Sequence, residues 1–120
     1  MTKALSRGDV VLAELPYSDG SRTKLRPALV VQNDVNNRRL QDVILALVTS
    51  TTHRASSEAT QLFIDISTPE GRQSGLLHSS AVKCEHLLTL HHRLVKRVIG
   101  RLSPALMQQI DECLKASLGL

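Results

Sequence analysis

Short apolar segments with the character of β-strands follow one another along most of this chain. They occupy residues 9–15, 28–31, 42–50, 61–66, 81–90 and 94–102. Many short strands without long crossover segments between them are typical of a mostly antiparallel, barrel-like sheet, and disfavour βαβ units. We therefore expect a mainly β fold with a sheet of about six strands.

The segments differ in how apolar and polar side chains alternate along them. Residues 42–50 (DVILALVTS) carry apolar side chains on both faces, which predicts a central strand. Residues 16–26 contain turn-forming and basic side chains and predict a basic loop. Because Pro27 disfavours the helical conformation of the residue before it, Arg26 is expected at the entrance of the strand at 28–31. Asn33-Asp34 and Pro69-Glu70-Gly71 are expected as turns.

The end of the chain has a different period. Ser103 followed by Pro104 is the combination expected at a helix N-cap and first helical position. Apolar residues then recur at helical spacing up to Gly119; they are Leu106, Ile110, Cys113, Leu114 and Leu118. One amphipathic C-terminal helix is expected to close the fold.

A single domain over residues 1–120 fits the length, since neither an internal repeat nor a linker interrupts the chain. The longest apolar run, residues 43–48, is too short to span a membrane, and the first residues lack the apolar core of a signal peptide. We expect a cytoplasmic protein without a membrane segment. In that reducing compartment Cys84 and Cys113 are expected as buried thiols without a disulfide.

The charge and the aromatic content of the chain indicate which class of partner it favours. Fifteen Lys and Arg against eleven Asp and Glu give a net charge of +4, which favours polyanions. Trp is absent, and there is one Tyr and one Phe, so recognition by base stacking is nearly excluded. Binding of a nucleic acid would have to use Arg, Lys and hydrogen bonds.

Motifs for common cofactors are missing. The chain contains no GxGxxG, P-loop, HExxH, GxSxG or paired CxxC pattern. Cys84, His86, His91 and His92 offer metal-ligating atoms, but their positions along a strand and at its end do not converge. We therefore expect no metal and no cofactor, and read these histidines as exposed or hydrogen-bonded.

Three segments in a fixed order identify a family resemblance. They are residues 7–11 (RGDVV), 26–34 (RPALVVQND) and 48–50 (VTS), and the similarity continues through 82–85, 88–90, 99–103 and the final helix. The chain resembles the MazF/PemK toxin endoribonucleases over nearly its whole length.

The resemblance implies a fold, an activity and partners. The fold is an SH3-like small barrel of antiparallel strands with a C-terminal helix, the CcdB/MazF-like fold, in a homodimer. The activity is that of a type II toxin: metal-independent, sequence-specific cleavage of single-stranded RNA or mRNA that inhibits translation and growth. The ribose 2′-hydroxyl attacks the adjacent phosphorus and leaves 2′,3′-cyclic phosphate and 5′-hydroxyl ends. The partner is an acidic antitoxin that covers the RNA site.

Three residues are candidates for catalysis. Arg26 has a planar fork of donors suited to the charge that builds on phosphoryl oxygens, and its alternative is an ordinary solvated side chain. Thr49 ends an apolar stripe and has a hydroxyl to donate, although strand propensity alone would explain it. Glu85 is a candidate general base, and a cross-strand ion pair is the other reading.

RNA-binding candidates lie mostly in the polar loops beside these residues. They are Ser21, Arg22, Lys24, Ser50, His53, Arg54 and Lys83. The loop after Gly20 departs from the family, whose members often have His or Glu there, so the proton-transfer groups stay open. Two other functions also stay open. A CcdB-like gyrase poison shares the fold, although the C-terminal Trp of those proteins is missing here, and a catalytically weak RNA-binding homologue would fit the altered loop.

Overall fold

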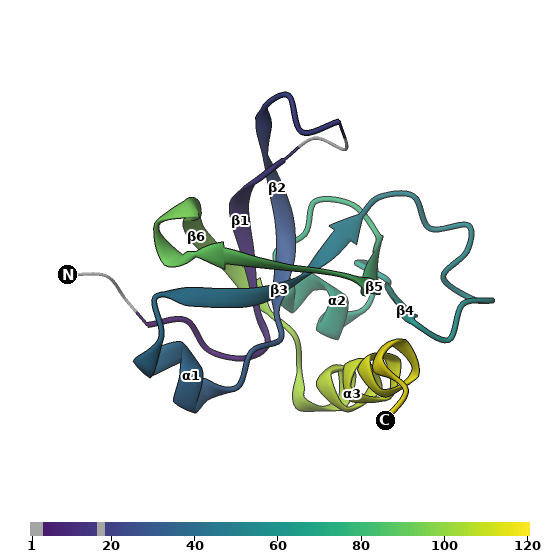
Figure 1. The fold of residues 1–120 in the computed structure, drawn as a ribbon. Helices are drawn as coiled ribbons and strands as arrows, with labels where there is room; N and C mark the ends of the chain where they lie inside the picture. Colours follow the sequence, from purple (N-terminus) through teal and green to yellow (C-terminus); the bar gives the residue numbers. More distant parts are fainter. Residues whose placement is uncertain (1–3, 17–18) are drawn as a thin grey trace.

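A computed structural model describes residues 4–16 and 19–120 of the chain (Figure 1). The elements, in chain order, are β1 (Asp9–Pro16), β2 (Thr23–Val30), α1 (Asp34–Arg39), β3 (Asp42–Thr49), β4 (Gln61–Ile64), α2 (Pro69–Gln73), β5 (Ser80–His91), a 3₁₀ turn (His92–Leu94), β6 (Val95–Arg101) and α3 (Pro104–Leu118).

All six strands join one sheet in the order β4-β5-β3-β2-β1-β6, and each neighbouring pair is antiparallel. The antiparallel sheet, its strand count and the C-terminal helix confirm the expected fold. The strand β3 lies between β5 and β2, which confirms its central position. Figure 1 shows α3 on one side of the sheet, where it packs against β4 and β5.

The sheet buries side chains on both faces, and alternate residues of one strand enter different clusters. On β3, Ala46 and Val48 belong to the cluster beneath α3, whereas Val43 and Leu45 belong to the cluster on the opposite face. The period of two in an extended strand produces this division. A strand that is apolar on both faces needs the interior of the sheet, because only there are both of its faces buried.

Helix α3 is capped at both ends. The Ser103 hydroxyl oxygen accepts a hydrogen bond from the Leu106 N–H at 3.2 Å, and Pro104 occupies the first turn. Gly119 ends the helix in the left-handed conformation, with φ +73°. Ile110 and Cys113 are the buried positions that face the sheet, so the predicted helix is confirmed in its start, end and inner face.

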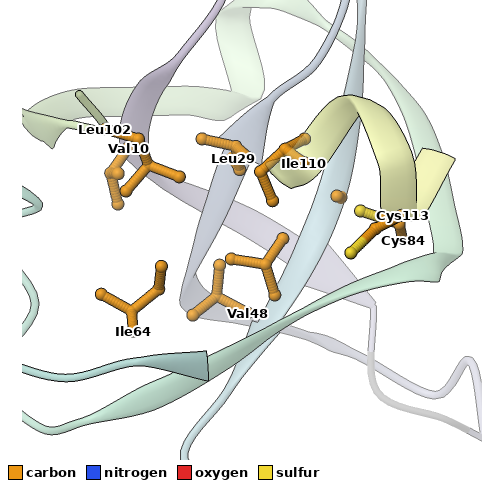
Figure 2. Close-up of a cluster of buried hydrophobic side chains, with 10 residues drawn as sticks. Val10, Leu29, Val48, Ile64, Cys84, Leu102, Ile110 and Cys113 are labelled. Carbon is orange, nitrogen blue, oxygen red and sulfur yellow. The ribbon is translucent and has the colours of Figure 1, made fainter. Parts of the chain in front are cut away.

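Both cysteines are free and buried. Figure 2 shows Cys84, from β5, and Cys113, from α3, with their sulfur atoms close to one another under the helix. Burial is the main cause that raises the pKa of the Cys84 thiol to about 12, and it also raises that of Cys113. The expectation of buried thiols is confirmed.

The expected start of the second strand is wrong. Strand β2 begins at Thr23, so Arg26 lies within a strand, where it pairs with Ala13 of β1, and not at a strand entrance. Residues 23–25 are all exposed, and a strand with no buried side chain has no alternating signal. Pairing with β1 in a hairpin supplies the stability that the pattern does not reveal.

Two short helices replace expected turns. The Asn33 side chain accepts from the Asn36 N–H and caps α1, while Thr68 accepts from the Gly71 N–H and caps α2. The residues that favour turns are also good N-caps, and six and five helical residues are too few to show a helical period. None of the helices in the described ranges combines the length and apolar character needed to cross a bilayer.

Candidate functional site

A gap opens between β2 and β3 at Pro27. The Val31 N–H donates to the Ile44 carbonyl at 3.1 Å, so alternate residues of β2, including Pro27, direct their backbone groups toward β3. Pro27 has no N–H to donate in that direction. The ladder accordingly ends one residue later, at the pair Ala28 and Leu47.

Arg26 and Thr49 stand on the two sides of this gap. The last pair of the ladder is Ala28 of β2 and Leu47 of β3. Arg26 precedes Ala28 by two residues and Thr49 follows Leu47 by two. The antiparallel register therefore places Arg26 opposite Thr49. Both are half-buried and line one cavity of about 480 Å³. The cavity also contains Lys24, Leu25, Pro27, Ser50, His78, Ser80, Arg97 and Ile99 among its lining residues.

A second cavity of about 300 Å³ adjoins the first at Thr49. It is lined by Thr49, Thr51, His53, Arg54, Gln61 and Lys83. We refer to the two cavities together as the groove. Thr49 lines both parts, and Arg26 lies in the first part only.

Among residues 4–16 and 19–120, the charged side chains that line the groove are all cationic. Lys24, Arg26 and Arg97 line the first cavity, and Arg54 and Lys83 line the second. The ion pairs found in the described part of the chain involve other basic residues, Arg7, Lys96 and Lys115. The groove therefore concentrates positive charge that no neighbouring carboxylate neutralises through an ion pair, an arrangement that attracts a polyanion.

The hydroxyl of Thr49 is oriented by the backbone that follows it. Its Oγ1 accepts a hydrogen bond from the Thr51 N–H at 3.1 Å. Because a hydroxyl both accepts and donates, the Thr49 O–H still has its proton to donate. A donor and a guanidinium on opposite sides of one cavity suit an oxyanion bound between them.

Glu85 is placed differently from the other two catalytic candidates. It lies where β5 bulges away from β3, between the residues paired with Ala46 and Leu47, and it is not among the lining residues of either cavity. Its carboxylate accepts from Gln61 Nε2 at 2.8 Å and from Thr60 Oγ1 at 3.0 Å. The structure therefore connects Glu85 to the groove through Gln61.

The hydrogen bonds of Glu85 decide its charge. Desolvation raises its pKa, but the bond from Gln61, a bond from the backbone of Glu85 itself, the bond from Thr60 and the charge of Lys83 together hold the pKa below its ordinary value. Glu85 is thus an ionised carboxylate that holds Gln61 in place. A carboxylate with a lowered pKa is a weak proton acceptor.

The predicted RNA-binding residues divide into two groups. Lys24, Ser50, His53, Arg54 and Lys83 line the groove.

Ser21 and Arg22 are exposed residues just before β2 and do not line either cavity. The Ser21 N–H and hydroxyl both donate to Asp19 Oδ1, at 2.9 and 2.7 Å, and these bonds lower the pKa of Asp19.

Two residues of the first cavity, His78 and Arg97, are not among the candidates that the sequence predicts. Arg97 pairs with Leu12 across β6 and β1, a neighbour relation that only the strand order reveals. His78 follows Gly75 in a turn and shortly precedes Ala81, whose pairing with Thr49 likewise appears only in the structure.

The structure does not bring the residues with metal-ligating atoms together. Cys84 is buried in the cluster under α3, whereas His91 and His92 line a separate cavity beside α1. Within residues 4–16 and 19–120, no three His, Cys, Asp or Glu side chains gather as a ligand set.

Known proteins match this chain consistently over nearly its full length. The model of the family described as PemK-like, MazF-like toxin of type II toxin-antitoxin system matches residues 6–118. Endoribonuclease EndoA of Bacillus subtilis (strain 168) is 31% identical over 117 residues, which cover 97% of this chain and 96% of that protein.

Solved structures of similar proteins have the same fold as this chain. An endoribonuclease from a mycobacterial species, in complex with its cognate antitoxin, has a TM-score of 0.79 at 26% identity, covering 98% of this chain and 97% of that one. The Mycobacterium tuberculosis toxin MazF-mt6 has a TM-score of 0.75 at 25% identity, covering 93% and 97% of the two chains.

Proposed function

The chain belongs to the PemK-like, MazF-like toxins of type II toxin-antitoxin systems, and on that premise we propose that it is a sequence-specific endoribonuclease that cleaves single-stranded RNA. The observation that carries the proposal is the placement of Arg26 opposite Thr49 in a groove lined by unpaired cations. The relatives that are named endoribonucleases support the same activity.

The groove suits RNA whose phosphates, and not its base faces, provide most of the contact. Lys24, Arg54 and Lys83 line it on either side of Thr49 and would each meet a phosphate. Phe63 is 44% exposed but lines neither cavity. Sequence preference would then depend on hydrogen bonds from side chains such as Ser50, His53 and Gln61 to base edges.

The cleavage step follows from the two groups across the gap. As the ribose 2′-oxygen attacks phosphorus, negative charge grows on the non-bridging oxygens, and the Arg26 guanidinium offers them a charged fork of donors. The Thr49 hydroxyl donates to the same oxygens from the other side. The bond to the 5′-oxygen then breaks, which leaves a 2′,3′-cyclic phosphate and a 5′-hydroxyl without a metal ion.

Glu85 enters this proposal as a positioning residue. Its carboxylate holds Gln61, which lines the cavity with Lys83, and its charge lies near that lysine. Ser21 and Arg22, just before β2, would contact RNA that extends beyond the groove.

The proposal includes partners and a place of action. A cognate antitoxin with an acidic segment would compete with RNA for the same cationic groove, as befits a toxin of a two-component system. A second copy of the chain would complete a homodimer, and the cytoplasm, where mRNA is translated, would be the compartment in which growth is inhibited.

Cleavage of a long, weakly structured RNA in excess chelator tests the proposal. Discrete fragments are expected from the single strand, and the same sequence annealed into a duplex should stay intact. RNA binding without fragments would contradict the proposal and identify a catalytically weak homologue. Inhibition of gyrase without fragments would contradict it in favour of a CcdB-like poison.

A further inference from the structure

We propose that His78 accepts the proton of the attacking 2′-hydroxyl. This inference rests on the proposed ribonuclease function, and it supplies a group that the reaction needs and that the loop after Gly20 does not contain. His78 lines the same cavity as Arg26 and Thr49.

The composition of that cavity singles out the imidazole. Among the residues that the structure describes, its other ionisable side chains are Lys24, Arg26 and Arg97, which as cations have no lone pair to offer. Its hydroxyl groups are poor bases. Histidine is the side chain whose ordinary titration falls between about pH 5 and pH 8, so it both accepts and returns a proton under physiological conditions.

The backbone around His78 is held firmly. Gly75 adopts φ +74° and packs so closely on β6 that a Cβ there would lie 2.0 Å from the Ile99 carbonyl oxygen. After the turn, the Ser80 hydroxyl donates to the His78 carbonyl at 2.8 Å. Ala81 then pairs with Thr49. The segment thus carries His78, on an anchored backbone, into the cavity that Thr49 also lines, which limits positional slack.

The imidazole itself is available. His78 is an exposed residue, and the hydrogen bonds of the described residues engage its carbonyl only. The charged groups that line the cavity with it are the three cations Lys24, Arg26 and Arg97. A phosphate bound among them brings the negative charge that stabilises the imidazolium formed when His78 takes a proton.

The 2′-oxygen gives its proton to the His78 imidazole and forms a bond to phosphorus, and the phosphorus to 5′-oxygen bond breaks. The 5′-oxygen leaves with the electron pair of that bond and takes a proton from water. The imidazolium then returns its proton to the hydroxide so formed, and His78 is neutral for the next turnover.

The other candidates fit the role less well. His53 lines the second cavity, which Arg26 does not line. It is therefore suited to contact a neighbouring phosphate or base and not the reacting group. Glu85 lines neither cavity and is engaged by Gln61 and Thr60.

Single-turnover cleavage rates across roughly pH 5 to 9 test this assignment. In the wild type, the rate should rise with pH as the imidazole loses its proton. His78→Gln should lower the rate by about 100-fold or more and abolish that rise, with RNA affinity nearly unchanged. His53→Gln should weaken RNA binding and keep the rise. His86→Gln is the matched control, because His86 is exposed and lines neither cavity.

Chemical rescue adds a second readout. Imidazole in the buffer should restore part of the cleavage by His78→Ala and leave the wild type unaffected. If the wild type cuts RNA but His78→Gln retains its rate and pH dependence, or loses rate only in proportion to RNA affinity, the assignment of His78 is wrong and the ribonuclease stands. If the wild type does not cut RNA, the proposed function itself fails.

Discussion

Arg26 of β2 and Thr49 of β3 face one another across a gap that begins where Pro27 ends the hydrogen-bonded ladder between their strands. A continuous ladder would fill the space between the two backbones. Because the ladder stops at Ala28 and Leu47, the cavity between Arg26 and Thr49 is part of the sheet architecture and needs no movement to form. Such preorganisation favours stabilisation of charge in a transition state.

The Thr49 hydroxyl should matter more than its methyl group. Thr49→Val removes the donor and keeps the shape, so we expect the single-turnover cleavage rate to fall by about 10²-fold to 10³-fold. Thr49→Ser keeps the hydroxyl and should retain most of the rate. Equal rates for the two variants would show that the hydroxyl does not act on the phosphate.

The cationic lining predicts a salt dependence of RNA binding. Each phosphate contact to a single strand contributes about −0.7 to the slope of log affinity against log salt. Lys83→Ala should therefore make the slope less negative by about 0.7. Lys115→Ala on α3 is the control, since Lys115 pairs with Glu112 away from the groove. Equal slopes for both variants would place Lys83 outside the RNA interface.

The core under α3 should respond to truncation in proportion to burial. Ile110 is fully buried, so Ile110→Ala should lower the free energy of unfolding by about 2–5 kcal/mol. Leu118→Ala on the same helix should cost far less, because Leu118 is 57% exposed. Denaturant titration of both variants checks this, and similar losses would mean that α3 does not pack as described.

Cys84 should resist alkylation in the folded protein. The thiolate is the reactive form, and a pKa raised to about 12 keeps nearly all of the thiol protonated at physiological pH. At about pH 8, roughly one molecule in 10⁴ would carry the thiolate, and burial blocks access as well. Mass spectrometry after iodoacetamide treatment should find Cys84 modified only in denaturant. Rapid modification of the native protein would contradict its burial.

The sequence predicted those features that depend on local chemistry or on a repeated pattern. The central position of β3 followed from its two apolar faces, and the bounds of α3 followed from Ser103 and Gly119. Arg26 and Thr49 were found through the family resemblance, and their placement across one gap appeared only in the structure.

The missed features depend on contacts that are distant in the chain. The start of β2 is stabilised by pairing with β1, and no side chain of residues 23–25 is buried to mark it. His78 and Arg97 join the groove from the turn before β5 and from β6, which the strand order brings beside β2 and β3. Neither residue type has a sequence pattern that distinguishes a groove position from a solvated surface.

The proposed cleavage chemistry is tested most directly by an analysis of the RNA ends that the wild type, Arg26→Ala and Arg39→Ala produce in excess chelator. Arg39 is an exposed arginine of α1, outside the groove, whose guanidinium donates a hydrogen bond to the Asn36 side chain. Arg39→Ala therefore controls for the loss of one positive charge.

The wild type and Arg39→Ala are expected to leave 2′,3′-cyclic phosphate and 5′-hydroxyl ends at similar rates. For Arg26→Ala we expect a rate lower by about 10²-fold or more, with RNA binding largely kept. Fragments that carry 3′-hydroxyl and 5′-phosphate ends, or an undiminished rate for Arg26→Ala, would contradict the proposed cleavage by Arg26 and Thr49.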